Sequence, residues 1–387
     1  MHIVIFNINR LVRYKGGMSK CFSEISNLLV DIGYDVSAIC FDEEQGEPGF
    51  PLKQNVVFIN ACDGVKSRIF SFLKNLKSLH FSRAKRHANR DLIELARIQE
   101  RVEGVLKRIH QVDLFISFQP EATYILSKIL EYEKRQIPII TMLHSNPKEV
   151  LGKPVFNYIR DQVSRSSAIQ VLQPEFAQQV KEFFPATKIR VIPNFVAEQF
   201  KKINYSEKKI ICVSRVVPGK RIDLLIDAFE LIRDRFPGWV VEVYGELSRN
   251  PDYVGKIKRM ILERKVGREF ILRGVTNDIP GVISKASIFA FPSSFEGFPI
   301  SLLEAMKAGL PAVGCKDCTG VNTLIVDGRT GYLSEPSAPS FAKALEQLMS
   351  SIDLRQTFGG QSQKEAEKYS RENVGEAWNQ LIKSVIN

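Results

Sequence analysis

The sequence predicts an α/β protein made of two doubly wound parallel sheets. Three observations carry this prediction. The chain has 387 residues, enough for two domains of ordinary size. Short β-branched segments alternate with segments of helical period, as in parallel sheets with crossover helices. The alternation also occurs twice, on either side of the polar stretch 192–209, which has the composition of a linker.

The composition is that of a soluble globular protein, with 44% hydrophobic and 25% charged residues. Its apolar runs are too short to span a membrane, and no export signal opens the sequence, which favours a cytoplasmic location. The expected strands of the first domain are His2–Phe6, Asp35–Cys40, Val56–Ile59, Asp113–Ser117, Ile137–Leu143, Ala168–Leu172 and Lys188–Ile192.

The second series gives a second Rossmann-like domain. Its expected strands are Ile210–Ser214, Val240–Tyr244, Phe270–Arg273, Ser287–Phe291 and Ala312–Gly314. Its expected helices are Ile222–Arg235, Asp252–Lys265, Ile300–Ala308 and Ser340–Ser350. We therefore divide the chain into domains at 1–195 and 196–369, and we expect a C-terminal helix at about 370–387 to pack back on the first domain. In open parallel sheets ligands bind at the carboxyl ends of the strands, so the ligand-binding residues are expected there.

The net charge is +11, and most of the excess positive charge lies between Lys66 and His110, a segment with twelve basic and four acidic residues. Apolar residues from Ile69 to Leu79 recur at helical spacing among the lysines and arginines, which predicts a basic amphipathic helix. Such a helix either lies on an anionic membrane surface or covers its own core with a solvated basic face. Nucleic acid is a weaker candidate partner, because no DNA- or RNA-binding motif accompanies the charge.

The six cysteines are too scattered for a disulfide framework. Cys315 and Cys318 form one CxxC pair. A structural zinc site needs two more ligands, and no second Cys or His pair stands at a useful spacing, so a loop after a strand is the favoured interpretation.

Three segments place anion-binding chemistry at predicted strand ends. Gly16 and Gly17 precede a helix, where backbone N–H groups can approach an anion, although a flexible turn explains the pair equally well. Arg215 and Lys220 follow the first strand of the second domain and could clamp a diphosphate, although solvated loop cations are the commoner case.

The most informative segment is 291–311, FPSSFEGFPISLLEAMKAGLP. It predicts a turn at Glu296 to Pro299 and a helix that ends at Gly309. The free N–H groups of the first helical turn suit phosphate oxygens. Glu296 and Glu304 are eight residues apart, at most about 12 Å along a helix, and two carboxylates so separated suit a polyhydroxylated ligand.

These segments together resemble the retaining glycosyltransferases of GT-B fold, in glycosyltransferase family 4. VIPNFV resembles the hinge motif of that family, VSRVVPGKRIDLLIDAF its phosphate-binding segment, SSFEGFPISLLEAMKAGLPAV its E-x7-E motif, and GVNTLIVDGRTGYL the segment that follows. The resemblance covers most of the chain and is strongest from Lys188 to about Ser350. The sequence departs from the family at Val-Tyr-Gly245-Glu and in the missing glycine of IPNFV.

The resemblance implies a role for each matching residue. Arg215 and Lys220 would contact the diphosphate, Glu304 the ribose, Glu296 the sugar hydroxyls, and His144, after a first-domain strand, the transferred sugar. Gly274 and Val275 would flank the base, and Gly16 and Gly17 would close over the phosphates. The backbone of one further segment would hold sugar and phosphate: Gly297, Phe298, Pro299, Ile300, Ser301, Leu302 and Leu303.

The predicted function is retaining transfer of a hexose or N-acetylhexosamine to a glycan or lipid-linked acceptor, in surface polysaccharide, lipopolysaccharide or glycolipid biosynthesis. The donor is expected to be a UDP-sugar, which is common among family members that have the sequence Glu-Gly-Phe-Pro found here at Glu296 to Pro299. We expect neither cofactor nor metal, since the chain has no DxD motif and Arg215, Lys220 and the helix start can supply the positive charge. The acceptor would bind the first domain, and the basic segment 66–110 could bring the protein to the inner membrane face. The alternatives are a GDP-mannose-dependent mannosyltransferase, a catalytically silent nucleotide-sugar-binding protein and, less consistent with the missing GxGxxG, a nicotinamide-dependent oxidoreductase.

Overall fold

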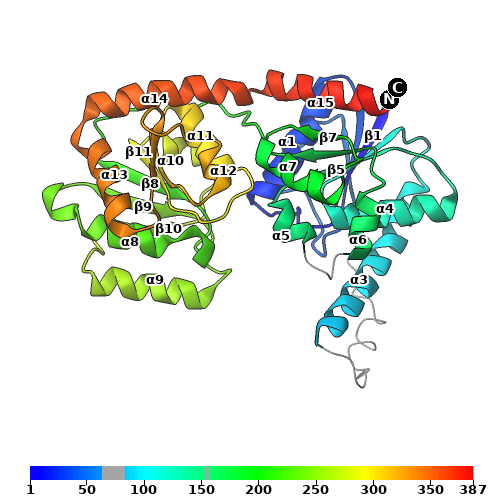
Figure 1. Cartoon of the computed structure of the whole chain (residues 1–387), viewed down its shortest axis with the longest axis horizontal. Helices are drawn as coiled ribbons and strands as arrows, with labels where there is room; N and C mark the ends of the chain where they lie inside the picture. Colours follow the sequence, from blue (N-terminus) through cyan, green and yellow to red (C-terminus); the bar gives the residue numbers. More distant parts are fainter. Residues whose placement is uncertain (63–82, 153–156, 387) are drawn as a thin grey trace. The chain divides into compact units, whose positions relative to one another are not determined.

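The computed structural model describes residues 1–62, 83–152 and 157–386 and divides the chain into two compact units. Unit 1 contains Met1–Pro193 together with Val374–Asn387, and unit 2 contains Asn194–Asn373. Each unit is a parallel sheet between helices (Figure 1). The C-terminal residues belong to unit 1 because the Tyr34 hydroxyl bonds to the Asn379 amide oxygen at 2.8 Å and Lys188 Nζ to the Ser384 carbonyl at 2.8 Å.

In unit 1 the strands run in the order β3-β2-β1-β4-β5-β6-β7, all parallel. The inner strands β2, β1, β4, β5 and β6 are mostly apolar and buried, as expected for strands covered on both faces, whereas the edge strands β3 and β7 are largely half-buried or exposed. The elements are β1 (His2–Asn7), α1 (Gly17–Asp31), β2 (Asp35–Cys40), β3 (Val56–Asn60), α3 (Arg83–Leu106), β4 (Leu114–Ser117), α4 (Pro120–Glu133), β5 (Ile139–Leu143), α5 (Pro147–Leu151), α6 (Asn157–Val163), β6 (Ala168–Val171), α7 (Pro174–Phe183) and β7 (Ile189–Val191).

In unit 2 the order is β10-β9-β8-β11-β12-β13, again all parallel. The elements are β8 (Lys209–Val213), the 3-10 turn η2 (Pro218–Lys220), α8 (Ile222–Glu230), η3 (Arg233–Arg235), β9 (Val240–Tyr244), α9 (Pro251–Glu263), β10 (Phe270–Gly274), α10 (Ile279–Ile283), β11 (Ile288–Phe291), α11 (Ile300–Ala308), β12 (Ala312–Cys315), α12 (Thr319–Asn322), β13 (Gly331–Ser334), α13 (Ala338–Ser350), α14 (Ile352–Ala366) and η4 (Glu367–Tyr369). The last helix, α15 (Arg371–Ile386), belongs to unit 1 from Val374 onward.

Each sheet has a point where the strand order changes direction. In unit 1 this point lies between β1 and β4, and in unit 2 between β8 and β11. The chain leaves these two neighbouring strands toward opposite flanks of the sheet, which leaves an open position between the two loops. The loops after β8 and β11 are therefore the place in unit 2 where a ligand is expected.

The α/β class and the two doubly wound sheets are confirmed, and three features differ from the prediction. Strand β13 was not predicted, because GYLS is short and follows a glycine turn. The helical segment 222–235 ends at Glu230 and continues as the separate turn η3.

The third difference is the supposed linker at 192–209, which is packed and belongs to unit 2 from Asn194 onward. Its Phe195 and Val196 are 1% exposed, and Lys307 Nζ donates to the Val196 carbonyl at 2.5 Å. The Tyr205 hydroxyl donates to the Gly309 carbonyl at 2.8 Å, while Arg355 donates to the Tyr205 carbonyl. Its apolar residues and Tyr205 pack on the domain, while most of its polar side chains remain exposed.

The predicted basic amphipathic helix falls mainly outside the described residues, which resume at Arg83 with α3. Leu95, Ile98 and Val102 of α3 are buried against the first sheet, so this part of the 66–110 segment covers the protein's own core. Within the part of the chain that the structure describes, no helix combines the length and apolar character that crossing a membrane requires.

Candidate active site

The loops after β8 and β11 meet through an ion pair. Lys220 Nζ contacts Glu296 Oε1, across 76 positions of sequence, and the two side chains are only 12% and 13% exposed. The Lys220 ammonium also lies 5.8 Å from the centre of the Phe291 ring. A cation and a carboxylate are thus held, partly shielded from water, at the topological switch point of unit 2.

The backbone fixes this pair. Residues Pro218–Lys220 form the 3-10 turn η2, and the carbonyl of Gly219 accepts hydrogen bonds from Ser294 N at 2.9 Å and Ser294 Oγ at 3.1 Å. Because Ser294 stands two residues before Glu296, these two bonds set the loop after β11 directly against the loop that carries Lys220.

Helix α11 begins beside the same pair with uncapped N–H groups. Its N-cap is Pro299, which offers no side-chain cap, and the first bond within the helix runs from Leu303 N to the Pro299 carbonyl at 3.1 Å. The N–H groups of Ile300, Ser301 and Leu302 precede that bond, which is the arrangement that binds anions at helix starts. Ser301 Oγ donates to the Val213 carbonyl at 2.9 Å and so holds the helix start to the end of β8.

The other residues of this segment are mostly buried. Phe298 packs edge-on against Tyr369, with ring centres 5.2 Å apart, and its carbonyl accepts from Asn194 Nδ2 at 3.5 Å. Glu304, one turn into α11, is 5% exposed. Glu296, the uncapped turn and Glu304 thus lie on one loop and helix, and Lys220 of the neighbouring loop joins them through its ion pair with Glu296.

Two glycines shape the ends of β9 and β10. Gly245 has φ +154°, and a Cβ there would lie 1.9 Å from the Ser214 carbonyl oxygen. Gly245 N donates to the Gly274 carbonyl at 2.8 Å, and Gly274 has φ +74°. Val275, next in the chain, is 64% exposed. Although Val-Tyr-Gly245-Glu departs from the family's motif, it keeps the glycine that the close approach to the Ser214 carbonyl requires.

Arg215 differs from Lys220. Its side chain is exposed and forms no ion pair with any residue that the structure describes. The neighbouring cation Arg221 instead donates to both carboxylate oxygens of Asp317, at 2.9 and 2.6 Å, and this contact raises the pKa of Arg221. The backbone at Arg221 is left-handed, with φ +48°. The sequence did not indicate this second pair.

The remaining predicted site residues belong to unit 1. Gly16 is the N-cap of α1 and offers no side-chain cap, and Gly17 is the first helical residue. A Cβ at position 16 would lie 2.5 Å from the Tyr14 ring. The loop is therefore close-packed on its Tyr14 side.

His144 follows β5 directly, and its ring centre lies 4.2 Å from that of Phe118. Both ring nitrogens are buried and have no hydrogen-bond partner within residues 1–62, 83–152 and 157–386. Burial lowers the pKa of His144 to about 3, so the imidazole is neutral at physiological pH. A neutral ring can accept or donate a hydrogen bond to a hydroxyl group.

Sequence reasoning missed Gly320. A Cβ at this position would lie 2.6 Å from the Glu296 carbonyl oxygen, so the start of α12 packs directly on the Glu296 turn. Gly320 begins the segment GVNTLI, which resembles the family's sequence after the E-x7-E motif. Sequence spacing could not show that this glycine packs on Glu296, 24 positions earlier.

The CxxC pair lies in a strand–loop connection. Cys315 ends β12, and Cys318 precedes α12; both thiols are free and buried. Burial raises the pKa of Cys315 to about 11 and that of Cys318 to about 12. Over the described ranges, no group of three or more His, Cys, Asp or Glu side chains is placed to hold a metal ion.

Comparison with known proteins identifies the family. Residues 196–365 match the model for glycosyl transferases group 1, and residues 15–200 match the model for glycosyltransferase family 4. The chain belongs to the GT-B glycosyltransferases. The two models meet at the junction between the units, so each unit corresponds to one half of the family's architecture.

Similar proteins support this membership. The poly(ribitol-phosphate) alpha-N-acetylglucosaminyltransferase of Staphylococcus aureus is 30% identical over 59% of this chain and 46% of its own length. The poly(glycerol-phosphate) alpha-glucosyltransferase of Bacillus subtilis is 33% identical over 46% of this chain and 27% of its own length. The matches thus span half or less of these two relatives. A crystal structure of S. aureus TarM, in complex with UDP among other ligands, superimposes with a TM-score of 0.76 at 18% identity, covering 100% of this chain and 99% of that one.

Proposed function

We propose that this protein transfers a hexose or N-acetylhexosamine, with retention of anomeric configuration, from a UDP-sugar to a hydroxyl group of a glycan or polyol-phosphate acceptor. One observation carries the proposal: the contact between Lys220 and Glu296 beside the uncapped start of α11. In a nucleotide-sugar the diphosphate is bonded directly to the sugar. The residues assigned to these two parts must therefore be neighbours, as Lys220 and Glu296 are.

Each group has a distinct task in this mechanism. The Lys220 ammonium and the N–H groups of Ile300 to Leu302 stabilise the negative charge that develops on the diphosphate as its bond to the anomeric carbon breaks. Glu296 orients the sugar through its hydroxyls and holds Lys220 when no donor is bound. Glu304 binds the ribose. Arg215, exposed at the end of β8, has the reach to join the diphosphate when the donor arrives.

Retention follows from attack on the same face of the sugar. The acceptor oxygen forms its bond to the anomeric carbon, the bond to the phosphate oxygen breaks, and the acceptor proton passes to the departing diphosphate. This route needs no carboxylate nucleophile, so Glu296 keeps a positioning role. The word alpha in the names of both curated relatives supports retention, because the usual UDP-hexose donors are themselves alpha-linked.

The same relatives guide the choice of substrates. Their names specify N-acetylglucosaminyl and glucosyl transfer to polyol-phosphate polymers, and the TarM structure contains UDP. In unit 1, His144 is proposed to contact the transferred sugar as a neutral hydrogen-bonding group, and Gly16 and Gly17 to contact phosphate. Charge stabilisation by Lys220 and backbone N–H groups leads us to propose a reaction that proceeds without a divalent cation.

The deciding experiment tests UDP-glucose, UDP-N-acetylglucosamine, GDP-mannose and ADP-glucose by thermal shift and by release of nucleoside diphosphate, with magnesium and with EDTA in parallel. We expect a shift and release with a UDP-sugar, equal in both buffers, and an alpha anomeric product by NMR. Release only with GDP-mannose would favour the mannosyltransferase, binding without release with every acceptor would favour a silent sensor, and loss of activity in EDTA would overturn metal independence.

Membrane binding is a separate proposal that rests on the charge of segment 66–110. Co-sedimentation with phosphatidylglycerol vesicles at low salt tests it, with phosphatidylcholine vesicles as the control. Equal sedimentation with the two vesicle types would contradict it.

A further inference from the structure

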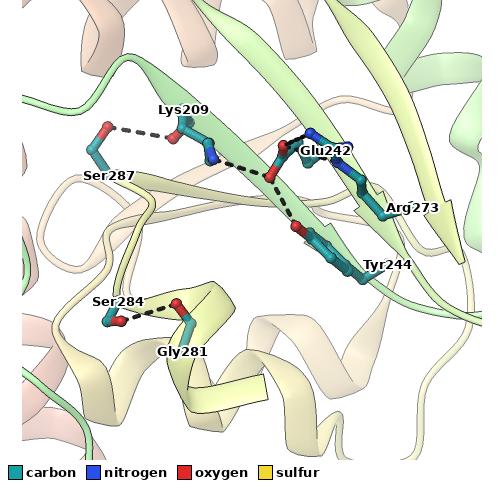
Figure 2. Close-up of polar contacts among 7 residues, drawn as sticks. All are labelled: Lys209, Glu242, Tyr244, Arg273, Gly281, Ser284 and Ser287. Atoms are coloured by element: carbon teal, nitrogen blue, oxygen red, sulfur yellow. Dashed lines mark hydrogen bonds and ion pairs between the residues drawn. The ribbon is translucent and has the colours of Figure 1, made fainter. Parts of the chain in front are cut away.

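A buried carboxylate interrupts the apolar strand β9. Glu242 stands between Val241 and Val243, whose side chains join the core on the opposite face of the sheet, and it is only 4% exposed. Figure 2 shows it surrounded by donors from three strands. Lys209 Nζ lies 3.1 Å from Oε2, the Tyr244 hydroxyl 2.9 Å from Oε2, and Arg273 Nε and Nη2 lie 3.0 and 2.5 Å from Oε1.

These donors keep Glu242 ionised. Burial alone would raise its pKa, but the hydrogen bonds from Arg273, Tyr244 and Lys209 outweigh burial and lower it. Burial, together with the hydrogen bond to Glu242, raises the pKa of Tyr244 to about 12, so the phenol remains a donor. A buried ion cluster of this kind contributes little net stability compared with apolar side chains of similar volume. A role in holding a particular conformation explains it better than stability does.

The conformation at issue is that of the glycine turns at the ends of β9 and β10. Tyr244 immediately precedes Gly245, and Arg273 immediately precedes Gly274. The register of β10 against β9 shifts between Leu272 and Gly274, so Arg273 is an extra residue in a β-bulge, and Gly274 takes the position opposite Tyr244. Glu242 thus bonds to the residue that immediately precedes each glycine turn, Tyr244 in β9 and Arg273 in β10.

The two glycines have no side chains that could hold these turns. Glycine has the widest conformational freedom of any residue, and both turns use positive φ. They are joined by the bond from Gly245 N to the Gly274 carbonyl, and β9 is joined to the Arg215 loop by the bond from Ser214 N to the Tyr244 carbonyl at 2.9 Å. Anchoring Tyr244 and Arg273 therefore fixes the edge at which the nucleoside of the donor is expected.

We propose that Glu242 is a positioning residue for the nucleoside half of the donor, acting through Tyr244 and Arg273 on the turns at Gly245 and Gly274. This inference rests on the proposed function, since it needs a nucleotide-sugar donor in unit 2. It makes a prediction that the proposed function alone does not: removing the Glu242 charge weakens binding of the nucleoside, while the chemistry at Lys220 and Glu296 continues.

The test measures binding of UMP and UDP by calorimetry for wild type, Glu242→Gln, Tyr244→Phe and Lys220→Met, together with kcat and KM for the UDP-sugar. We expect Glu242→Gln to raise the Kd of UMP and UDP by the same factor, about 3- to 30-fold. It should raise KM similarly and leave kcat unchanged. Lys220→Met should weaken UDP more than UMP, because its cation serves the diphosphate.

A matched control is Glu346→Gln, which removes one carboxylate from an ion pair with Arg235 elsewhere in unit 2. It should leave both Kd values unchanged. Tyr244→Phe retains both ion pairs and should fold even if Glu242→Gln does not. It should raise the Kd of UMP in the same direction by a smaller factor.

The outcomes separate the two proposals. If wild type binds UMP, and Tyr244→Phe and folded Glu242→Gln bind it with the same Kd, the role of Glu242 is overturned while the proposed function stands. A fall in kcat with unchanged KM would also overturn it, since that pattern would place Glu242 in the chemistry or in overall stability. If wild type bound neither UMP nor UDP, the proposed donor and this inference would both be wrong.

Discussion

Gly320 packs on the carbonyl of Glu296 so closely that a methyl group at position 320 would lie 2.6 Å from that oxygen. The first residues of α12 therefore form a fixed support under the turn that carries the Glu296 carboxylate. The support is made of backbone, which cannot move aside as a flexible side chain could.

Gly320→Ala should therefore impair turnover more than it impairs folding. We expect a loss of about ten- to a hundredfold in nucleoside diphosphate release, because the Glu296 turn must shift, and a stability loss of about 1–3 kcal/mol. Gly255→Ala is the control, since a Cβ at this helical position meets nothing within 4 Å. Equal activities for the two variants would show that the turn tolerates displacement.

Lys220→Met should lower kcat by about a hundredfold, because one preorganised cation at the leaving group is lost. Loss of the partner leaves Glu296 unpaired, so the double variant with Glu296→Gln tests whether any unfolding arises from that carboxylate. Arg221→Met is the matched control. Its guanidinium serves Asp317, and the variant should keep near-normal kcat with a loss of about 0.5–1 kcal/mol in stability. If Arg221→Met lost more activity than Lys220→Met, Arg221 rather than Lys220 would be the cation that serves the leaving group.

Two adjacent glycines of α14 should respond oppositely to alanine. At Gly359 a Cβ would lie 2.2 Å from the Gly309 carbonyl and 2.3 Å from the Tyr205 hydroxyl, whereas at Gly360 it would meet nothing within 4 Å. We expect Gly359→Ala to destabilise the protein by about 1–3 kcal/mol through overpacking, and Gly360→Ala to stabilise it by about 0.5–1 kcal/mol through helix propensity. Urea unfolding measures both. Similar values would mean that α14 and the 192–209 segment are not packed as found.

His144 should make the protein less stable at mildly acidic pH. Its pKa is about 3 when folded and 6.5 when exposed, so below pH 6.5 the unfolded chain binds a proton that the folded protein does not. Stability is therefore lost as pH falls from 6.5 toward 3, by about 2 kcal/mol between pH 7 and pH 5. In urea unfolding, the free energy of unfolding of His144→Gln should fall by about 2 kcal/mol less than that of wild type between pH 7 and pH 5. Parallel curves would place the histidine in contact with water.

The sequence allowed every strand but β13, and the loop–helix segment at Glu296, to be predicted, because both depend on local pattern: β-branched runs, Pro299 at a helix start and Gly309 at its end. The pairing of Lys220 with Glu296 was not visible, since it depends on β8 and β11 becoming neighbours. The sequence predicts a strand at Val240–Tyr244 and gives no sign of a role for Glu242, because its donors come from three strands, β8, β9 and β10, that become neighbours only in the fold. The polar composition of 192–209 predicts a linker, but Phe195, Val196 and Tyr205 pack against residues more than a hundred positions away, which composition does not reveal.

The assignment of Val374 onward to unit 1 has a consequence for biosynthesis. Unit 2 is one uninterrupted stretch, so it has all its residues as soon as Asn373 leaves the ribosome, whereas unit 1 is still missing the partners of Leu28 and Tyr34. The domain translated first is thus the one completed last, and nascent chains stalled before Val374 would expose an apolar surface on which chaperones act.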